Sequence, residues 1–139
     1  MTNKENIATI VDFIKPGSTV YVATVDGTTP HVRPFQFQFE QDGKLWFCTA
    51  NIKEIFAQIT KNPKMEFTFV SPEYVTMRVN GSVVISDNSA IKQKIIAENE
   101  LVRSIYKEAD NPIFSVFFMD RGDVRISYLT GDPDKKFSF

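Results

Sequence analysis

Two cations stand at positions where a positive charge needs an explanation. Arg33 lies within HVRPFQFQF, residues 31–39, a segment whose aromatic and apolar residues are typical of a packed β-strand. An arginine on a packed surface needs a partner for its charge. Lys53 lies in the first turn of a predicted helix, where the helix dipole disfavours a cation by about 0.3–1 kcal/mol. An anion bound at that helix end would make Lys53 favourable.

The residues around Lys53 offer the other groups that an anion site needs. Thr49 lies where a predicted strand ends and the helix begins. Asn51 is a predicted N-cap, and Glu54, three residues later, completes a capping-box pattern. Free backbone N–H groups, the Thr49 hydroxyl, the Lys53 ammonium and Arg33 from the preceding strand would together form a phosphate pocket.

The same residues also allow an explanation without a ligand. Arg33 would then pair with a nearby carboxylate, and Lys53 would be solvated on an exposed face. Pro34 indicates an edge strand or a β-bulge, and a bulge would reset the alternation of faces along the strand. Counting along the strand therefore leaves the direction of Arg33 open.

Residue counts argue against several other kinds of site. Cys48 and His31 are the only cysteine and the only histidine, so neither a disulfide framework nor a zinc or other metal site is predicted. Cys48 is expected to be a small buried residue rather than a nucleophile. The formal net charge of -1 provides no basic field for nucleic acid. Several aromatic residues could flank a flat cofactor or simply form the core: Phe35, Phe37, Trp46 and Phe47.

The pattern around these residues predicts a mainly β protein with inserted helices. Apolar spacing indicates helices over residues 3–14 and from residue 52 to the Asn62–Pro63 stop, and two helical pieces within 88–108. Short turns join three strands into an antiparallel meander, which favours a barrel, and a final hairpin precedes a loosely attached tail. The predicted strands cover residues 18–25, 31–39, 44–50, 64–71, 73–87, 113–120 and 124–131.

Length and hydropathy bound the organisation of the chain. Its 139 residues suit one domain, residues 1–139. Glu5 and Asp12 interrupt the apolar run that a signal peptide would need, and the densest apolar stretch, residues 113–119, is too short to span a bilayer. We therefore expect a cytoplasmic protein that makes no membrane contact.

Three ordered segments, VATVDGTTPHVRPF, GKLWFCTANIKEIFAQITKNPKMEFTFV and MRVNGSVVISD, carry a family resemblance. Together they resemble the pyridoxamine 5'-phosphate oxidase-like family, the FMN-binding split barrels, and especially its short single-domain members. The resemblance runs from Val22 to the YLTGDP segment. It implies a six-stranded antiparallel split β-barrel with peripheral short helices. It also implies a homodimer that holds FMN at the subunit interface.

The resemblance further implies which residues bind the cofactor. One group, on the second strand, would bind the phosphate through a guanidinium and the flavin through the main chain: Arg33, Pro34, Phe35 and Gln36. A second group would lie beside the flavin ring and ribityl chain or complete the phosphate site: Phe47, Cys48, Thr49, Asn51 and Lys53. Many relatives have basic phosphate ligands where this chain has Glu54 and Ile55, so Lys53 would serve instead.

The implied activity is that of an FMN-dependent oxidoreductase with a small-molecule electron donor and acceptor. The flavin carries the redox step, so no catalytic side chain is assigned. The chain lacks the longer C-terminal portion that true pyridoxamine-phosphate oxidases use to hold substrate, so oxidation of vitamin B6 is not implied. Two alternatives stay open: an FMN-binding module for storage or sensing, and a split barrel that binds haem, with His31 as the one available axial histidine.

Overall fold

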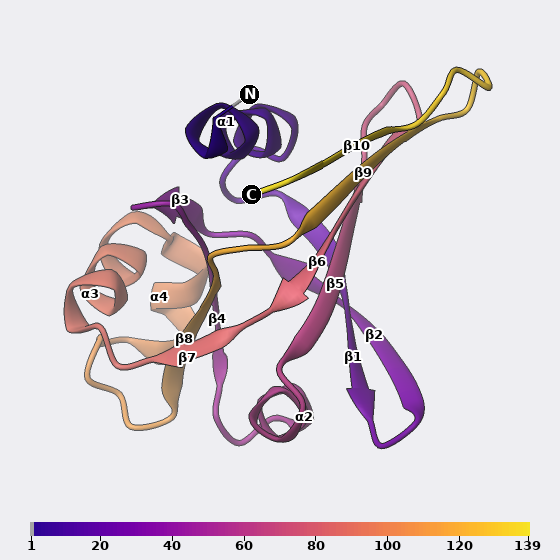
Figure 1. Ribbon diagram of the computed structural model, residues 1–139. Helices are drawn as coiled ribbons and strands as arrows, with labels where there is room; N and C mark the ends of the chain where they lie inside the picture. Colours follow the sequence, from indigo (N-terminus) through magenta and orange to yellow (C-terminus); the bar gives the residue numbers. More distant parts are fainter. Residues whose placement is uncertain (1) are drawn as a thin grey trace.

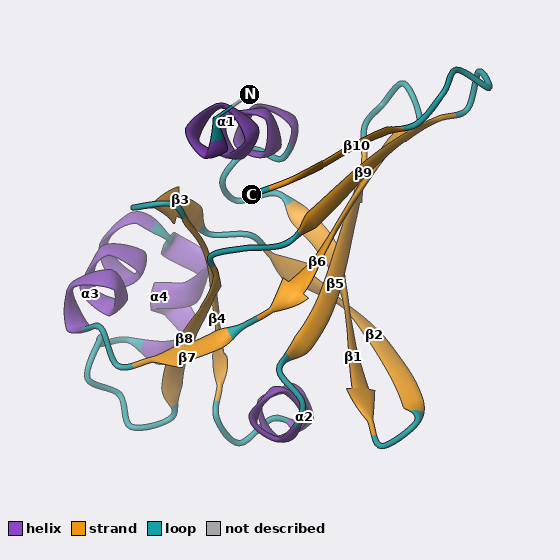
Figure 2. Cartoon of the chain, viewed as in Figure 1, coloured by secondary structure: helices purple, strands orange, loops and turns teal. Residues whose placement is uncertain are grey.

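The computed structural model describes residues 2–139, which form antiparallel strands with short helices at their margins (Figures 1 and 2). The helices are α1 (Asn3–Phe13), α2 (Glu54–Lys61), α3 (Ser89–Glu98) and α4 (Glu100–Tyr106). The first strands are β1 (Thr19–Asp26), β2 (Thr29–Gln36), β3 (Phe39–Gln41), β4 (Lys44–Ala50) and β5 (Lys64–Val70). The remaining ones are β6 (Val75–Ser82), β7 (Val84–Ser86), β8 (Phe114–Met119), β9 (Asp123–Tyr128) and β10 (Lys135–Ser138).

These strands form two sheets. The larger sheet has the order β10-β9-β6-β5-β1-β2, and the smaller has the order β3-β4-β8-β7. The predicted class, an antiparallel split barrel with peripheral short helices, is confirmed, with six strands in the larger sheet and four more in the smaller. None of the helices in residues 2–139 has both the length and the apolar character needed to cross a membrane.

Three segments cross from one sheet to the other where continuous pairing was predicted. The strand predicted over residues 31–39 divides into β2 and β3, and the strand predicted over 73–87 divides into β6 and β7. The predicted β8–β9 hairpin is wrong, because those strands belong to different sheets, and β2 does not pair with β4. A strand that bends at a barrel corner sends its two halves into different sheets. The tail is also better attached than predicted, since β10 pairs with β9.

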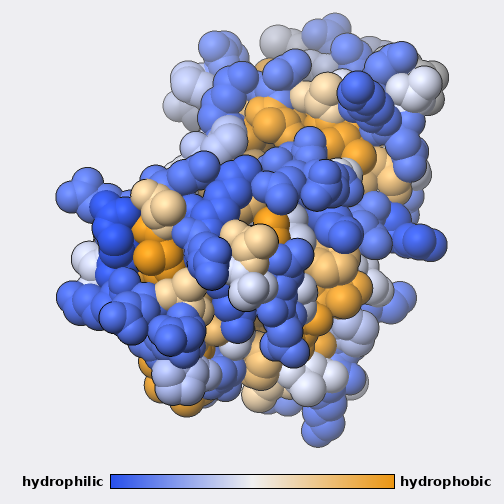
Figure 3. Space-filling model, turned by 90° about the vertical axis from the view of Figure 1, so that its left-hand side faces the viewer, coloured by the Kyte–Doolittle hydropathy of each residue, from blue (hydrophilic) through white to orange (hydrophobic). Residues whose placement is uncertain are grey.

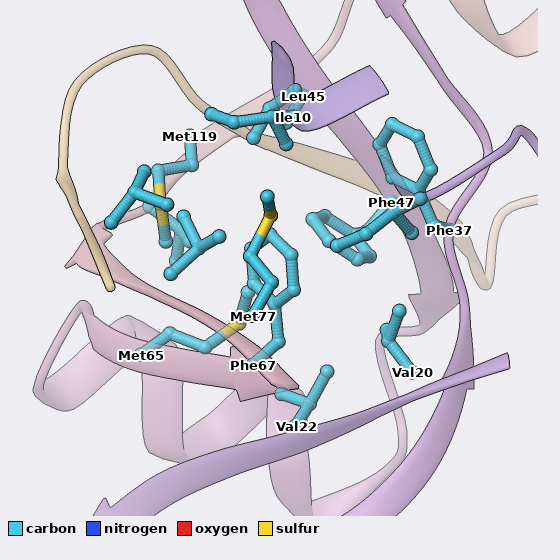
Figure 4. Packing of buried hydrophobic residues seen from close by; sticks show 14 of the residues in the cluster. Ile10, Val20, Val22, Phe37, Leu45, Phe47, Met65, Phe67, Met77 and Met119 are labelled. Atoms are coloured by element: carbon cyan, nitrogen blue, oxygen red, sulfur yellow. The ribbon is translucent and has the colours of Figure 1, made fainter. Parts of the chain in front are cut away.

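The main core lies between the two sheets and is rich in phenylalanine and methionine. Figure 4 shows these side chains gathered from both sheets, with Phe47, Phe67 and Met77 near its centre. Phe47 is fully buried, and its ring stacks on Phe117 with a centroid separation of 5.5 Å. α1 closes one end of this core with Ile10 and Ile14. The aromatic residues near the predicted site are therefore mostly core.

A second apolar cluster lies on the other face of β4 and β8, where α3 and α4 cover it. It contains Trp46, Phe114 and Ile95. The two predicted helical pieces are confirmed, with Asn88 capping α3 and Asn99 capping α4. Figure 3, which views the side that carries these helices, shows a mostly hydrophilic surface with separate apolar areas. The helices therefore bury the back of the smaller sheet and present a largely polar surface.

Candidate functional site

The predicted site residues lie on β2, on β4 and in the connection from β4 to α2, and the region between the free edges of β2 and β4 is called the wedge below. The two strands separate beyond β3, and α2 follows directly from the far end of β4 (Figure 1). β3 pairs with β4 only as far as Trp46, whereas β8 pairs with β4 as far as Ala50. β2 is an edge strand of the larger sheet. Two strand edges that pair with no other described strand therefore border the wedge.

The β4 edge offers main-chain groups of Cys48 to the wedge. The N–H and C=O of a residue in an antiparallel strand point to the same side, and residues two apart share that side. The carbonyl of Trp46 accepts a hydrogen bond from Gln38 N at 3.1 Å, on the β3 side of β4. The main-chain groups of Cys48 consequently point to the same side, past the end of β3.

The β2 edge is regular through Pro34. β2 and β1 pair without interruption from Thr29 to Gln36, so the edge-strand alternative is confirmed and the bulge is absent. Phe37 N donates toward β1, to Ser18 O at 2.9 Å, so the main-chain groups of Pro34 and Gln36 point to the free edge. Proline lacks an N–H, and at this free edge its absence removes no hydrogen bond between strands.

This regular register also settles the direction of Arg33. Arg33 pairs with Val22, and Phe35 pairs with Val20. Both valines are fully buried. Residues directly opposite each other share a face of the sheet, so Arg33 and Phe35 point toward the barrel interior. Arg33 approaches α2 across β1, and not through the β2–β4 pairing that the meander implied.

The Arg33 guanidinium is held by neutral groups. Its Nη1 donates to Thr24 Oγ1 at 2.7 Å, and its Nη2 donates to Gln58 Oε1 at 3.0 Å. The ion pairs found in residues 2–139 do not include Arg33, so the carboxylate partner that the explanation without a ligand required is not observed. Burial lowers the pKa of Arg33, and the nearby charge of Glu54 acts in the opposite direction.

α2 begins later than the sequence indicated. Lys53 is the N-cap, and no side chain caps the helix. The predicted capping box at Asn51 is wrong, because the Asn51 amide donates instead to Pro112 O at 2.8 Å and to Ser115 Oγ at 3.3 Å. Ile52 lies outside the helix and is 76% exposed. The helix start therefore combines uncapped N–H groups with the Lys53 ammonium.

Thr49 has a buried hydroxyl without a partner. It is 2% exposed, and no hydrogen-bonding group in the described part of the chain reaches its Oγ1. Thr49 lies two residues beyond Phe47 on β4, so it shares the interior face of the strand. An unsatisfied buried polar atom costs about 1–3 kcal/mol. Asn6 Oδ1 and Trp46 Nε1 are also buried without a partner, but Thr49 alone among the three lies at the end of β4 that leads into α2, where a bound polar group would satisfy it.

Two predicted site residues have side chains that are already engaged. The Phe47 ring lies wholly within the core, and its main-chain groups, which alternate in direction with those of Cys48, point toward β8. The Gln36 amide accepts from Asn99 Nδ2 at 2.8 Å and donates to Gly17 O at 3.2 Å. For Gln36 the main chain is what remains available to the wedge, whereas Phe47 offers it neither its side chain nor its main-chain hydrogen-bonding groups.

Sequence reasoning missed Thr24 and Gln58. Gln58 follows Ile55 by three residues and precedes Ile59, so it lies on the buried face of α2. A polar residue within that apolar stripe was the available signal. Thr24 is 1% exposed and lies on the interior face of β1, where the alternation Val20, Val22, Thr24 continues the core pattern. Each is a buried polar residue that requires a partner.

Cys48 is expected to be unreactive in the folded protein. Burial raises the pKa of its thiol to about 12, and the charge of Lys53 opposes this shift. The thiolate is the reactive form, so an alkylating reagent at pH 8 should modify Cys48 slowly in the native protein and rapidly in denaturant. Because the folded pKa lies above the unfolded one, Cys48 should contribute a loss of stability as the pH rises from about 9 toward 12. Rapid, stoichiometric alkylation of the native protein at pH 8 would contradict the buried thiol.

Comparisons with known proteins place this geometry in context. The family model described as pyridoxamine 5'-phosphate oxidase matches residues 7–127. A NimC/NimA family protein from Clostridium acetobutylicum has a similar structure, with 29% identity, coverage of 97% of this chain and 93% of that one, and a TM-score of 0.88. No curated protein matches the sequence.

Two more distant structures share the fold. A pyridoxamine 5'-phosphate oxidase-related, FMN-binding protein from Nostoc punctiforme is 17% identical, with coverage of 100% of this chain and 96% of that one, and a TM-score of 0.73. A haem-binding protein from Mycobacterium smegmatis is 16% identical, with coverage of 99% of this chain and 58% of that one, and a TM-score of 0.72.

Proposed function

The chain belongs to the pyridoxamine 5'-phosphate oxidase family, and on that premise we propose that it binds FMN in the wedge between β2 and β4 and acts as an FMN-dependent oxidoreductase. Bound FMN would supply the electron and hydride transfer, and the chain would bind and orient it. The substrates would be a small-molecule electron donor and acceptor. A quinone, a nitroaromatic compound or a free flavin reduced with a nicotinamide cofactor fits this role.

The buried, unpartnered Thr49 hydroxyl is the observation that carries the proposal. Arg33 has no carboxylate partner, and α2 begins at Lys53 without a side-chain cap. A phosphate attracts guanidinium, ammonium and helix N–H groups alike. These residues fit the phosphate end of FMN. The donors of Asn51 are engaged, its main-chain N–H with Ile113 O at 2.8 Å and its amide nitrogen with Pro112 O at 2.8 Å. Its Oδ1 can only accept, so Asn51 would bind a ribityl hydroxyl of FMN rather than the phosphate.

The free strand edges fit the flavin ring. A flavin has alternating hydrogen-bond donors and acceptors along one side of its ring system. Main-chain groups of Pro34, Gln36 and Cys48 point away from their own sheets and offer the complementary donors and acceptors. Phe35 lies between Pro34 and Gln36, and its main-chain groups point toward β1. Its ring is only partly buried, so the ring is the part of Phe35 that would contact a planar cofactor.

The proposal includes a homodimer with FMN at the interface. The outer face of β1 and β2 carries Tyr21, Val32 and Pro34 on the side opposite Arg33. Tyr21 is 50% exposed and Val32 is 70% exposed. Neighbouring apolar side chains exposed on one sheet face are typical of a surface that another protein covers. A second copy of this chain is the proposed partner.

An absorbance spectrum of the purified protein, recorded after incubation with FMN and removal of the excess, tests the proposal. We expect resolved flavin bands at about one FMN per chain, a mass of two chains in light scattering, and oxidation of NADH or NADPH when a quinone or nitroaromatic compound is added. Failure to retain FMN would overturn the proposal. Bound FMN without turnover would indicate a storage or sensing module, and a haem spectrum would indicate the haem-binding alternative.

A further inference from the structure

Thr24, Gln58 and Arg33 form a closed triangle of hydrogen bonds whose directions are fixed by chemistry. A guanidinium can only donate, so Thr24 Oγ1 and Gln58 Oε1 are both acceptors toward Arg33. The Thr24 hydroxyl is left to donate its own proton, and it donates to Gln58 Oε1 at 2.5 Å. The donor and the acceptor of each of the three contacts are thereby assigned. Thr24 and Gln58 are both buried, which keeps water out of the arrangement.

The two acceptors contact one edge of the guanidinium and leave another edge available. Thr24 Oγ1 accepts from Nη1 and Gln58 Oε1 accepts from Nη2, and the two oxygens are hydrogen-bonded to each other, so together they occupy the outer Nη1–Nη2 edge that a carboxylate would occupy. Nη1 also lies within 3.4 Å of Val22 O and 3.5 Å of His31 O. The Nε–H and one Nη2–H, along the adjacent edge, find no acceptor within the described residues.

We propose that Thr24 and Gln58 are positioning residues, which imitate a carboxylate without its charge and hold the free edge of Arg33 ready for the FMN phosphate. This inference rests on the proposed function. A carboxylate at the same place would orient the guanidinium equally well, but it would cancel the charge that attracts a phosphate. Two neutral acceptors orient the guanidinium without adding a carboxylate to the nearby charge of Glu54, so more of its positive charge is left for the ligand. As a result, the protein would bind a phosphorylated flavin more tightly than an unphosphorylated one.

The ratio of FMN affinity to riboflavin affinity is the readout, because only FMN carries the phosphate. Thr24→Val removes the hydroxyl at nearly constant shape, and we expect the ratio to fall about 3- to 10-fold. Thr24→Ser retains the hydroxyl and should keep the ratio close to that of the wild type. Gln58→Glu places a charge against Arg33 and should lower the ratio about 10-fold or more.

Matched controls separate positioning from general damage. Thr9→Val removes an α1 hydroxyl that donates to Glu5 O, and Gln93→Glu adds a charge on the exposed side of α3. Both should keep the wild-type ratio. Binding of riboflavin also reports whether each variant is folded, because a damaged wedge would lose both flavins together.

The outcomes distinguish this inference from the proposed function. A reduced ratio for Thr24→Val and Gln58→Glu, with Thr24→Ser near wild type, supports the positioning role. An unchanged ratio in Thr24→Val and Gln58→Glu, while Arg33→Ala loses the preference for FMN, overturns the positioning role and leaves the phosphate site in place. An equal loss of both flavins in Thr24→Val and Gln58→Glu also overturns it, since the residues would then only maintain the fold. A wild-type chain without any preference for FMN overturns the phosphate site and the positioning role together.

Discussion

Replacing Arg33 with alanine is expected to lower the affinity for FMN by about 10- to 150-fold and to change the affinity for riboflavin by less than about threefold. The reason is the free edge of its guanidinium, which has no carboxylate partner and would form charge-assisted hydrogen bonds only with the phosphate. Isothermal titration of each flavin would measure both affinities. The FMN affinity of Arg33→Lys should lie between those of the wild type and Arg33→Ala, since an ammonium keeps the charge but not the planar fork.

Arg121→Ala is the matched control for the Arg33 measurement. Its side chain is 85% exposed and contacts Asp120 at 3.8 Å, in the connection between β8 and β9. Loss of this cation changes the net charge by the same amount as loss of Arg33, yet the affinity for FMN should stay at the wild-type value. If Arg33→Ala binds FMN as tightly as the control does, the phosphate is bound elsewhere.

Phe47→Ala is expected to lower the free energy of unfolding by about 3–5 kcal/mol, the largest stability effect among the substitutions considered. Phe47 is fully buried between the sheets, and its ring contacts four others: Phe35, Phe37, Phe67 and Phe117. Its removal leaves a cavity that these rings can fill only in part. Urea denaturation followed by tryptophan fluorescence would measure the change, since Trp46 is adjacent in β4.

Ile52→Ala provides the comparison for Phe47. Ile52 is 76% exposed and precedes α2, so its truncation should change the free energy of unfolding by no more than about 0.5 kcal/mol. A Phe47→Ala protein as stable as Ile52→Ala would mean that the aromatic cluster does not hold the two sheets together. The Ile52→Ala measurement also tests the corrected start of α2. If Ile52 were in the helix on its buried apolar face, truncating it would lower the free energy of unfolding by much more.

The sequence by itself was sufficient to locate most helices and strands and to raise the question of whether an anion binds near Arg33 and Lys53. Apolar spacing located α1 closely, and it placed α3 and α4 together within residues 88–108. It also located α2 but started it two residues too early. Side-chain periodicity is a property of consecutive residues, so the sequence alone carries it. The charge of Arg33 within an aromatic strand pointed to a ligand or a carboxylate. The order of the motifs indicated the family, which the match over residues 7–127 establishes.

The tertiary structure alone decided how these elements meet. It showed that β2 and β4 belong to different sheets, that Arg33 reaches Gln58 across β1, and that the Thr49 hydroxyl is buried without a partner. Strand pairing joins segments that are distant in the chain, and it depends on where a strand bends into the other sheet. Side-chain alternation is nearly the same on either side of such a bend, so the pattern that locates a strand carries little information about its neighbours.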